Sequence, residues 1–252
     1  MKVKDIVHFL DGVAPFETAL DFDNAGFLVG DGNAAVTGVT VALDCYNSVI
    51  DEAEKNGDNL IITHHPIIFD PVKNLYSDTP LYRLANKGIA LISMHTNLDM
   101  AVGGVNDELC KKIGLKNIEF QNKVAENAFE LRTGELEKTL SADEFAYYLG
   151  VCLSVRTKYS VGKNPIKRVA VCSGSGGSML TEVSALSVDA FVTADCKHSH
   201  FVDADRYGIS LFDCGHFNTE DVIVEPLAQK LRDAFKDLNV HTSHYSNIKY
   251  IL

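Results

Sequence analysis

The chain has 252 residues, of which 46% are hydrophobic and 23% are charged, so it is long enough for one large domain or two modest ones with an apolar core. Its formal net charge of -11 argues against a protein that wraps a nucleic-acid backbone, although a single nucleotide can still bind where metal ions supply positive charge. No apolar run approaches the length of a membrane span, the first residues lack the apolar core of a secretory signal, and the six cysteines form no CxxC pair, so we expect a cytoplasmic protein with reduced thiols and no membrane partner.

The first half of the chain alternates between segments typical of helices and segments typical of strands. Thr79 and Pro80 mark a helix start, and Gly57 and Gly88 mark helix ends. The expected helices are 2–12, 46–56, 80–87 and 106–113, and the expected strands are 27–29, 38–44, 60–64 and 89–94. This alternation predicts a mostly parallel sheet that is flanked by helices.

The second half repeats this alternation after an irregular segment, 115–140, which we expect to be a crossover between two lobes. The expected helices are 141–151, opened by a capping box from Ser141 to Glu144, then 178–186, 199–207 and 219–235, with Pro226 inside the last helix or at a break in it. The expected strands are 169–172, 190–193, 209–212 and 240–245. Because the order strand, helix, strand, helix, strand occurs in both halves, the sequence predicts an α/β fold with two related lobes and mostly parallel or mixed sheets.

Three of the expected strands end in histidine or carboxylate residues. The strand 60–64 runs into His64-His65-Pro66, where the proline stops the strand. His95-Thr96-Asn97-Leu98-Asp99 follows the strand 89–94, and His216-Phe217-Asn218-Thr219-Glu220 follows the strand 209–212. Both of these motifs have the pattern His-x-Asn-x-acid, at the equivalent place in each half. The carboxyl ends of strands form the ligand crevice of open α/β sheets.

Two interpretations of these strand ends are open. Each motif alone is compatible with a capped loop, because asparagine favours turns and an acidic residue suits the first turn of a helix. Together the motifs offer four imidazoles and two carboxylates, more than the roughly three protein ligands of an open tetrahedral site. Two ions bridged by a carboxylate would use the surplus. The nitrogen and oxygen donors suit zinc, iron, manganese or nickel.

The sequence resembles the NGG-interacting factor three family, whose members are dinuclear-metal hexameric proteins often labelled GTP cyclohydrolase I type 2. The resemblance extends over nearly the whole chain. It is carried by Ile62 to Pro66, Ser93 to Asp99 and Gly215 to Glu220, and also by Asp23 to Gly26, Gly174 to Ser178 and Thr193 to Asp195.

This resemblance implies a division of the chain, a ligand set and an assembly. Residues 1–123 and 209–252 would form a metal-binding lobe, and 124–208 would form a second lobe inserted between them, with the dinuclear site at the strand ends between the lobes. The implied ligands of the two divalent ions are His64, His65, Asp99, His216 and Glu220, with His95 as an additional ligand or neighbour. The implied assembly is a ring-shaped homohexamer, a trimer of dimers.

The sequence departs from the family pattern at three positions. Phe22 stands where tryptophan is common, and Ala194 replaces a usual glycine. Ser199 stands where histidine is common, between His198 and His200. These departures leave the implied ligands intact and concern the substrate side of the site, where His198 or His200 is either a substitute or a solvated residue at a helix start.

The predicted chemistry is hydrolysis by a metal-activated water, as two adjacent divalent ions allow. For a purine nucleotide this means opening of the imidazole ring, with His95 and His198 as candidate proton carriers; a phosphoester is the other substrate class. The alternative is a metal-binding scaffold or regulatory protein without turnover. The glycine-rich loop Gly174 to Gly177 is either a phosphate cradle or a tight turn, and we favour the turn.

Overall fold

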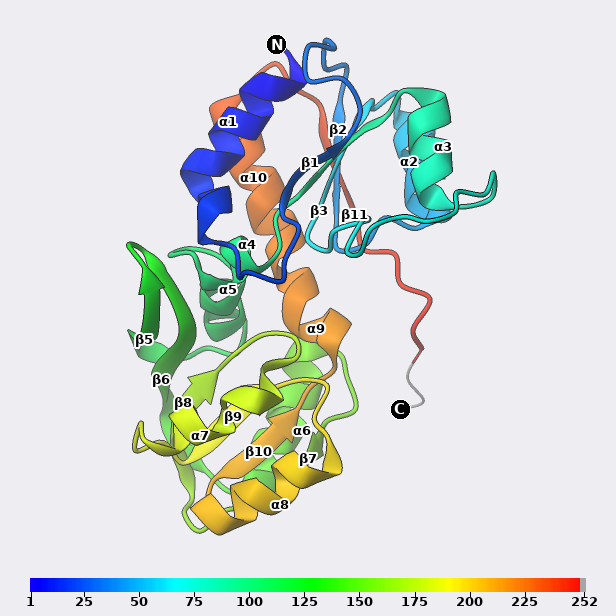
Figure 1. Ribbon diagram of the computed structural model, residues 1–252. Helices are drawn as coiled ribbons and strands as arrows, with labels where there is room; N and C mark the ends of the chain where they lie inside the picture. The colour runs from blue at the N-terminus through cyan, green and yellow to red at the C-terminus, as the bar shows by residue number, and fades with distance from the viewer. Residues whose placement is uncertain (250–252) are drawn as a thin grey trace. The chain divides into compact units, whose positions relative to one another are not determined.

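The computed structural model describes residues 1–249, which form two compact units (Figure 1). The first unit contains Met1–Ala101 and Ile223–Asn247, and the second contains Val102–Val222 together with residues 248–249. No helix within the described part of the chain is long and apolar enough to cross a membrane.

The first unit is built on a five-stranded sheet with the strand order β1-β4-β3-β2-β11. Its strands are β1 (Gly26–Val29), β2 (Val39–Ala42), β3 (Leu60–Thr63), β4 (Ala90–Ser93) and β11 (Val240–Ser243). All neighbours are parallel except β1, which is antiparallel to β4. Every residue of β2, β3 and β4 is buried, as expected of parallel strands that are covered on both faces.

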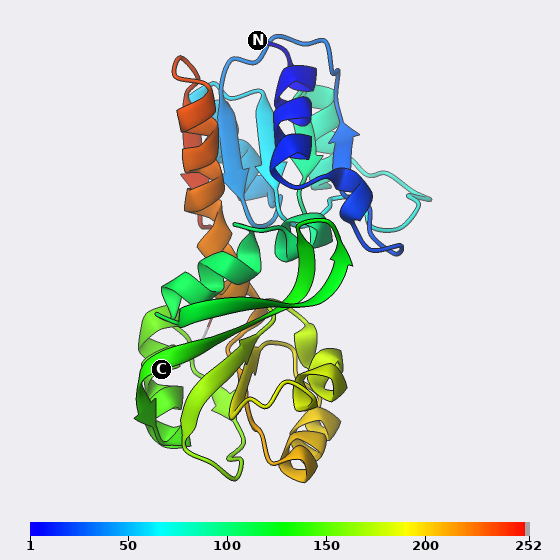
Figure 2. The same cartoon turned by 90° about the vertical axis from the view of Figure 1, so that its left-hand side faces the viewer.

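Helices cover both faces of this sheet (Figures 1 and 2). They are α1 (Val3–Val13), α2 (Asn47–Asn56), α3 (Pro80–Lys87) and α10 (Val224–Ala234), with the short α4 (Thr96–Met100) following β4. The predicted start of α3 is confirmed, because the Thr79 hydroxyl accepts the Tyr82 N–H and Pro80 occupies the first helical position. Gly57 and Gly88 end α2 and α3 in the left-handed conformation.

The second unit is built on a six-stranded sheet with the strand order β5-β6-β8-β9-β10-β7. Its strands are β5 (Lys116–Ala125), β6 (Ala128–Leu140), β7 (Lys158–Tyr159), β8 (Ile166–Val171), β9 (Ala190–Thr193) and β10 (Ser210–Asp213). The three central strands β8, β9 and β10 are parallel, and the others are antiparallel to their neighbours. The α/β fold with two related, mixed sheets is therefore confirmed, since β8 to β10 repeat the order of β2 to β4.

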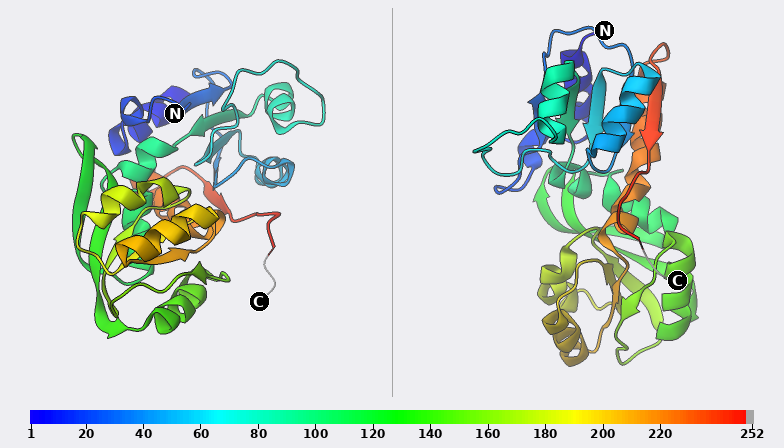
Figure 3. Two further views of the ribbon diagram at one scale, coloured as in Figure 1. Left: turned by 60° about the horizontal axis from the view of Figure 1, so that its bottom comes forward. Right: turned by 90° about the vertical axis from the view of Figure 1, so that its right-hand side faces the viewer.

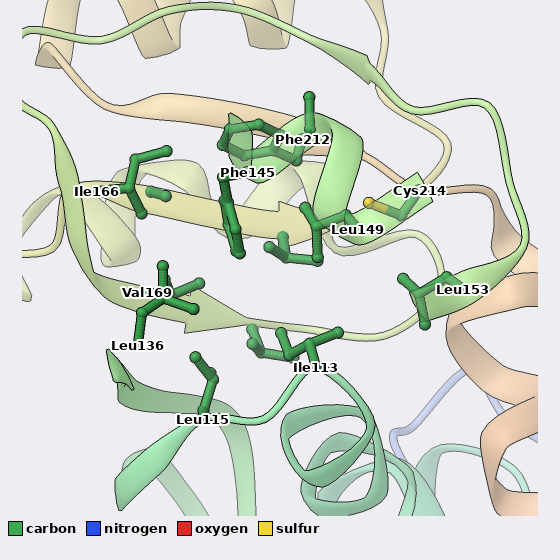
Figure 4. Close-up of a cluster of buried hydrophobic side chains, with 14 of the residues drawn as sticks. Ile113, Leu115, Leu136, Phe145, Leu149, Leu153, Ile166, Val169, Phe212 and Cys214 are labelled. Atoms are coloured by element: carbon green, nitrogen blue, oxygen red, sulfur yellow. The ribbon is translucent and has the colours of Figure 1, made fainter. Parts of the chain in front are cut away.

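The helices of the second unit flank its sheet, which separates two apolar clusters because alternate residues of β8, β9 and β10 face opposite sides. The helices are α5 (Val105–Lys112), α6 (Ala142–Leu153), α7 (Leu180–Ser184), α8 (His198–Tyr207) and α9 (His216–Glu220). Phe145 and Leu149 of α6 pack against Val169 and Phe212 of the sheet (Figure 4). A second cluster lies beneath α7 and α8, which lie side by side (Figure 3). The capping box that opens α6 is present as predicted.

The expectation of a crossover at 115–140 is wrong, because this segment is the hairpin of β5 and β6. The expected division gives 116–123 and 210–213 to the first lobe, yet β5 and β10 are hydrogen-bonded into the sheet of the second unit.

The helix expected over 219–235 is interrupted, which is the second of the two alternatives given for Pro226. A 3-10 turn, Asp221–Ile223, separates α9 from α10. This break places Pro226 in the first turn of α10, where a missing N–H leaves no helix hydrogen bond unmade.

Candidate metal centre

Three histidines of the first unit lie together where β3 and β4 end. The two strands are parallel and in register, with Thr63 opposite Ser93, so the residues that follow them leave the sheet at the same edge. The ring centroids of His64 and His65 are 5.1 Å apart, those of His64 and His95 are 5.3 Å apart, and those of His65 and His95 are 5.6 Å apart. One nitrogen from each ring lies within 4.8 Å of the others, close enough for all three to hold a single metal ion.

Hydrogen bonds fix the backbone at these strand ends. The His64 and His65 amides donate to the carbonyls of Ala42 and Leu43, which continues the parallel ladder beyond β3. The Ser93 hydroxyl donates to the His64 carbonyl. The two adjacent histidines thus stay at the sheet edge, where both rings can turn toward the same region.

Asp99 joins this group from the helix α4. It lies one helical turn after His95, and its Oδ1 is 3.5 Å from His64 Nε2. A carboxylate beside imidazole nitrogens adds the negative charge that a divalent cation requires.

Each of the three rings is oriented through its Nδ1 atom. His64 Nδ1 lies 2.7 Å from the Met94 carbonyl, His65 Nδ1 lies 2.8 Å from Asp44 Oδ1, and His95 Nδ1 lies 2.7 Å from Asp23 Oδ1. A carbonyl or carboxylate can only accept at these positions, so the Nδ1 atoms carry protons. This pattern fits the neutral tautomer whose Nε2 coordinates a metal ion, and metal-binding histidines commonly have such partners.

Asp23 is the more enclosed of the two carboxylate partners, with a side chain that is 0% exposed against 31% for Asp44. Its Oδ1 faces His95, and its Oδ2 accepts from both the amide and the hydroxyl of Thr96. Burial opposes ionisation of this carboxyl, but the hydrogen bonds from His95 and Thr96 outweigh that effect and lower the pKa of Asp23 to about 2. Asp23 is therefore a permanent anion that holds the ring of His95.

A second pair of predicted ligands lies together in the second unit. His216 is the first residue of α9 and Glu220 lies one turn later, so His216 Nε2 is 2.9 Å from Glu220 Oε2. His216 Nδ1 lies 2.7 Å from Asp195 Oδ2, which repeats the carboxylate–histidine pairing of the first unit. Glu220 is buried.

The glycine-rich loop after β8 supports this pair. Gly174 has a φ of +58°, and a Cβ atom there would overlap Glu220 Oε1. Its N–H donates to the Thr219 hydroxyl, the Ser173 N–H donates to Asn106 Oδ1, and the Gly176 N–H donates to the Thr193 hydroxyl. Because these N–H groups already have acceptors within the second unit, the structure favours the tight turn over the phosphate cradle.

The histidines on α8 have different surroundings. His200 Nδ1 accepts the Lys197 N–H at 3.3 Å, and a side chain at Gly177 would overlap the His200 ring. His200 is therefore half-buried against the glycine-rich loop instead of solvated, and its role as a substitute for the histidine of the family stays a prediction. His198 and Ser199 are exposed at the start of α8.

The carboxylates that orient the rings were not among the predicted site residues, although Asp195 belongs to one of the motifs that carry the family resemblance. Asp44 and Asp195 each lie just after a strand, β2 and β9, as the histidines do. Applying the strand-end argument to single acidic residues would have found both. Asp23 belongs to a turn that was noted, but its pairing with His95, 72 positions away along the chain, could not be inferred from spacing.

Comparisons with known proteins place these observations in a wider context. The family model for Duf34/NIF3 (NGG1p interacting factor 3) matches residues 1–249. A Clostridium acetobutylicum protein named GTP cyclohydrolase 1 type 2 homolog is 32% identical, with 96% of this chain and 94% of that protein covered. A Campylobacter jejuni protein of the same name is 35% identical, with 92% and 93% covered. The crystal structure of a Staphylococcus aureus hypothetical protein has a TM-score of 0.93 at 31% identity, with 100% of this chain and 99% of that chain covered.

Proposed function

The chain belongs to the Duf34/NIF3 family, and we propose that it is a metal-dependent hydrolase that acts on a nucleotide or a phosphoester. The observation that carries this proposal is the cluster of His64, His65 and His95, whose Nδ1 atoms are all directed at acceptors. The name of the relatives, GTP cyclohydrolase 1 type 2 homolog, points to the same class of reaction.

We further propose that the centre holds two divalent ions, with zinc, iron, manganese or nickel as the suitable metals. Its ligands would be His64, His65, Asp99, His216 and Glu220, with His95 as a further ligand or neighbour. His216 and Glu220 are included because the His-x-Asn-x-acid motif recurs in both units. By family resemblance we also propose a ring-shaped homohexamer, which native mass spectrometry would detect.

Divalent ions held by these residues would supply a water of lowered pKa and would polarise an oxygen of the substrate. The residues of the chain would do the remaining work. Asp44 and Asp195 hold the rings of His65 and His216 in one orientation. His95, whose Nδ1 proton is held by Asp23, would accept and return a proton at Nε2 only as a neighbour of the ions, because a coordinated Nε2 has no lone pair left for a proton; His198 is the second candidate for this role.

The experiment that tests the proposal compares ligand variants with a matched histidine variant. Asp99→Ala and Glu220→Ala each remove an anionic ligand, so both should lose most of the metal measured by elemental analysis. His241→Ala removes a histidine that pairs with Asp58 at 2.9 Å instead, and it should retain the wild-type metal content. Full metal content in the double variant Asp99→Ala/Glu220→Ala would refute the ligand assignment.

The same preparations test whether the protein is an enzyme. Wild-type protein loaded with each metal in turn should hydrolyse one member of a panel of purine nucleotides and phosphoesters, and Asp99→Ala should not. Retained metal with no turnover across the panel would favour a metal-binding scaffold over a hydrolase.

A further inference from the structure

Two large aromatic side chains lie exposed beside the histidine cluster of the first unit. Phe22 is 62% exposed and Phe69 is 49% exposed, so neither ring belongs to the apolar core. Their ring centroids are 6.2 Å apart at an angle of 44°. Isolated exposed apolar residues are ordinary, but two rings in contact with each other form a patch that calls for an explanation.

The patch is continuous with the candidate metal ligands. The Phe69 ring meets the His95 ring edge-to-face, with centroids 6.2 Å apart. His95 in turn contacts His64 and His65. A ligand that covers the two phenylalanines therefore lies next to the residues proposed to bind metal.

Hydrogen bonds hold the two loops that carry these rings. Asp23, the neighbour of Phe22, is bound to His95 and Thr96. Asn24 Nδ2 donates to the carbonyl of Ile68, the neighbour of Phe69, at 2.6 Å. The backbone beside each aromatic residue is thus held in place, so the two loops lose little conformational entropy when a ligand binds.

We propose that Phe22 and Phe69 form a platform on which the planar heteroaromatic base of the substrate stacks. The inference rests on the proposed function, because it identifies the class of substrate that the same site takes. A nucleotide carries both a flat ring that stacks on aromatic side chains and charged oxygens that bind metal ions. A phosphoester without a base would leave both rings in water.

The competing occupant is a second copy of the chain. Val72, Leu75 and Tyr76, further along the segment that carries Phe69, are also exposed, so the patch could be covered by another molecule. The two alternatives differ in what they respond to, since base stacking depends on ligand and self-association depends on protein concentration.

The experiment uses a fluorescent reporter that the sequence makes possible. The chain contains no tryptophan, so Phe22→Trp introduces a single emitter at the platform. The metal-loaded Phe22→Trp protein is titrated with guanosine, with guanosine monophosphate and with ribose 5-phosphate, which has no base. Guanosine and its monophosphate should quench the emission, and ribose 5-phosphate should not.

Truncation of the other ring measures the contribution of stacking. Loss of a stacked aromatic weakens base binding by about 5- to 150-fold, so Phe69→Ala in the reporter background should weaken guanosine binding within that range. Tyr147→Ala removes a ring that is 77% exposed in the second unit, and it should leave guanosine affinity unchanged. Thermal unfolding of each variant verifies that it is folded.

Three results would overturn the platform: no binding of guanosine, an affinity for guanosine that Phe69→Ala leaves within twofold, or an emission that changes with protein concentration alone. Metal analysis of the same preparations separates this inference from the proposed function. If the wild-type protein retains metal but turns over no member of the panel while guanosine still quenches the reporter, the hydrolase proposal fails and the platform stands. If metal binding and turnover are normal but Phe69→Ala has no effect, only the platform fails.

Discussion

Removal of the Asp44 carboxylate should weaken metal binding without removing any ligand. Asp44 Oδ1 holds His65 Nδ1 at 2.8 Å, and Asp44→Ala leaves that ring free to turn. Loss of such a partner lowers metal affinity by roughly 10- to 100-fold. The side chains of His65 and Asp44 are 24% and 31% exposed, so water can partly replace the carboxylate. We therefore expect a loss near the lower limit, about tenfold or about 1.4 kcal/mol.

Asp58→Ala is the matched control for this variant. It breaks a carboxylate–histidine pair of similar length, 2.9 Å to His241, away from the predicted ligands. Metal affinity is measured for both variants by competition with a chromogenic chelator at one pH, and circular dichroism verifies that both are folded. If Asp44→Ala binds metal as tightly as the wild type, or loses no more affinity than Asp58→Ala, then Asp44 does not orient a ligand.

Three further predictions concern the second unit. Arg132 is 0% exposed and paired with Asp107, so Arg132→Met should lower the free energy of unfolding by about 3–5 kcal/mol in urea titrations, because it leaves a carboxylate without its cation. Burial, followed by the charge of Asp107, raises the pKa of the Cys110 thiol from 9.0 to about 12. The stability that the buried, protonated thiol contributes is complete below pH 9 and is lost as the pH rises toward 12. Between pH 8 and pH 10 the wild type should therefore lose about 1 kcal/mol more unfolding free energy than Cys110→Ala. Gly174→Ala, at a φ of +58°, should destabilise by about 1–3 kcal/mol in the same assay, whereas Gly12→Ala, inside α1 with open space around it, should stabilise slightly.

The parallel core and its histidines could be predicted because each follows from a short, local pattern. A buried strand, a helix and another buried strand specify a parallel sheet, and residues after parallel strands leave it at one edge. His64 and His95 were expected to be neighbours for that reason, and their rings are in contact. That His216 and Glu220 bind the same ions as His64, His65 and Asp99 remains a prediction, because a sequence pattern within one unit does not specify how the two units are arranged.

The hairpin of β5 and β6 was missed because β5 lacks the two sequence features that identify a strand, an apolar run and a regular alternation of inward and outward side chains. β5 is an edge strand whose residues are mostly exposed, so it lacks the apolar run of a buried strand. Asn117 and Asn122 have φ values of 52° and 55°, and the pairing with β6 is irregular near both ends of the strand. These irregularities interrupt the alternation of inward and outward side chains on which strand prediction depends.

The asparagine in the middle of the recurring His-x-Asn-x-acid motif does not form a turn, which is the role that its residue type suggested. Asparagine was expected as a turn former, but Asn97 lies within α4, where its Nδ2 donates to the Ala14 carbonyl at 2.8 Å. Asn218 lies within α9 and donates in the same way to the Leu153 carbonyl at 3.0 Å. A helix of five residues is far too short to be stable alone, so each asparagine ties such a helix to the backbone of its own unit. In each unit the asparagine thereby fixes the short helix at whose start the histidine lies and which carries the acid one turn later, so the geometry of the candidate ligand pair depends on the residue between them.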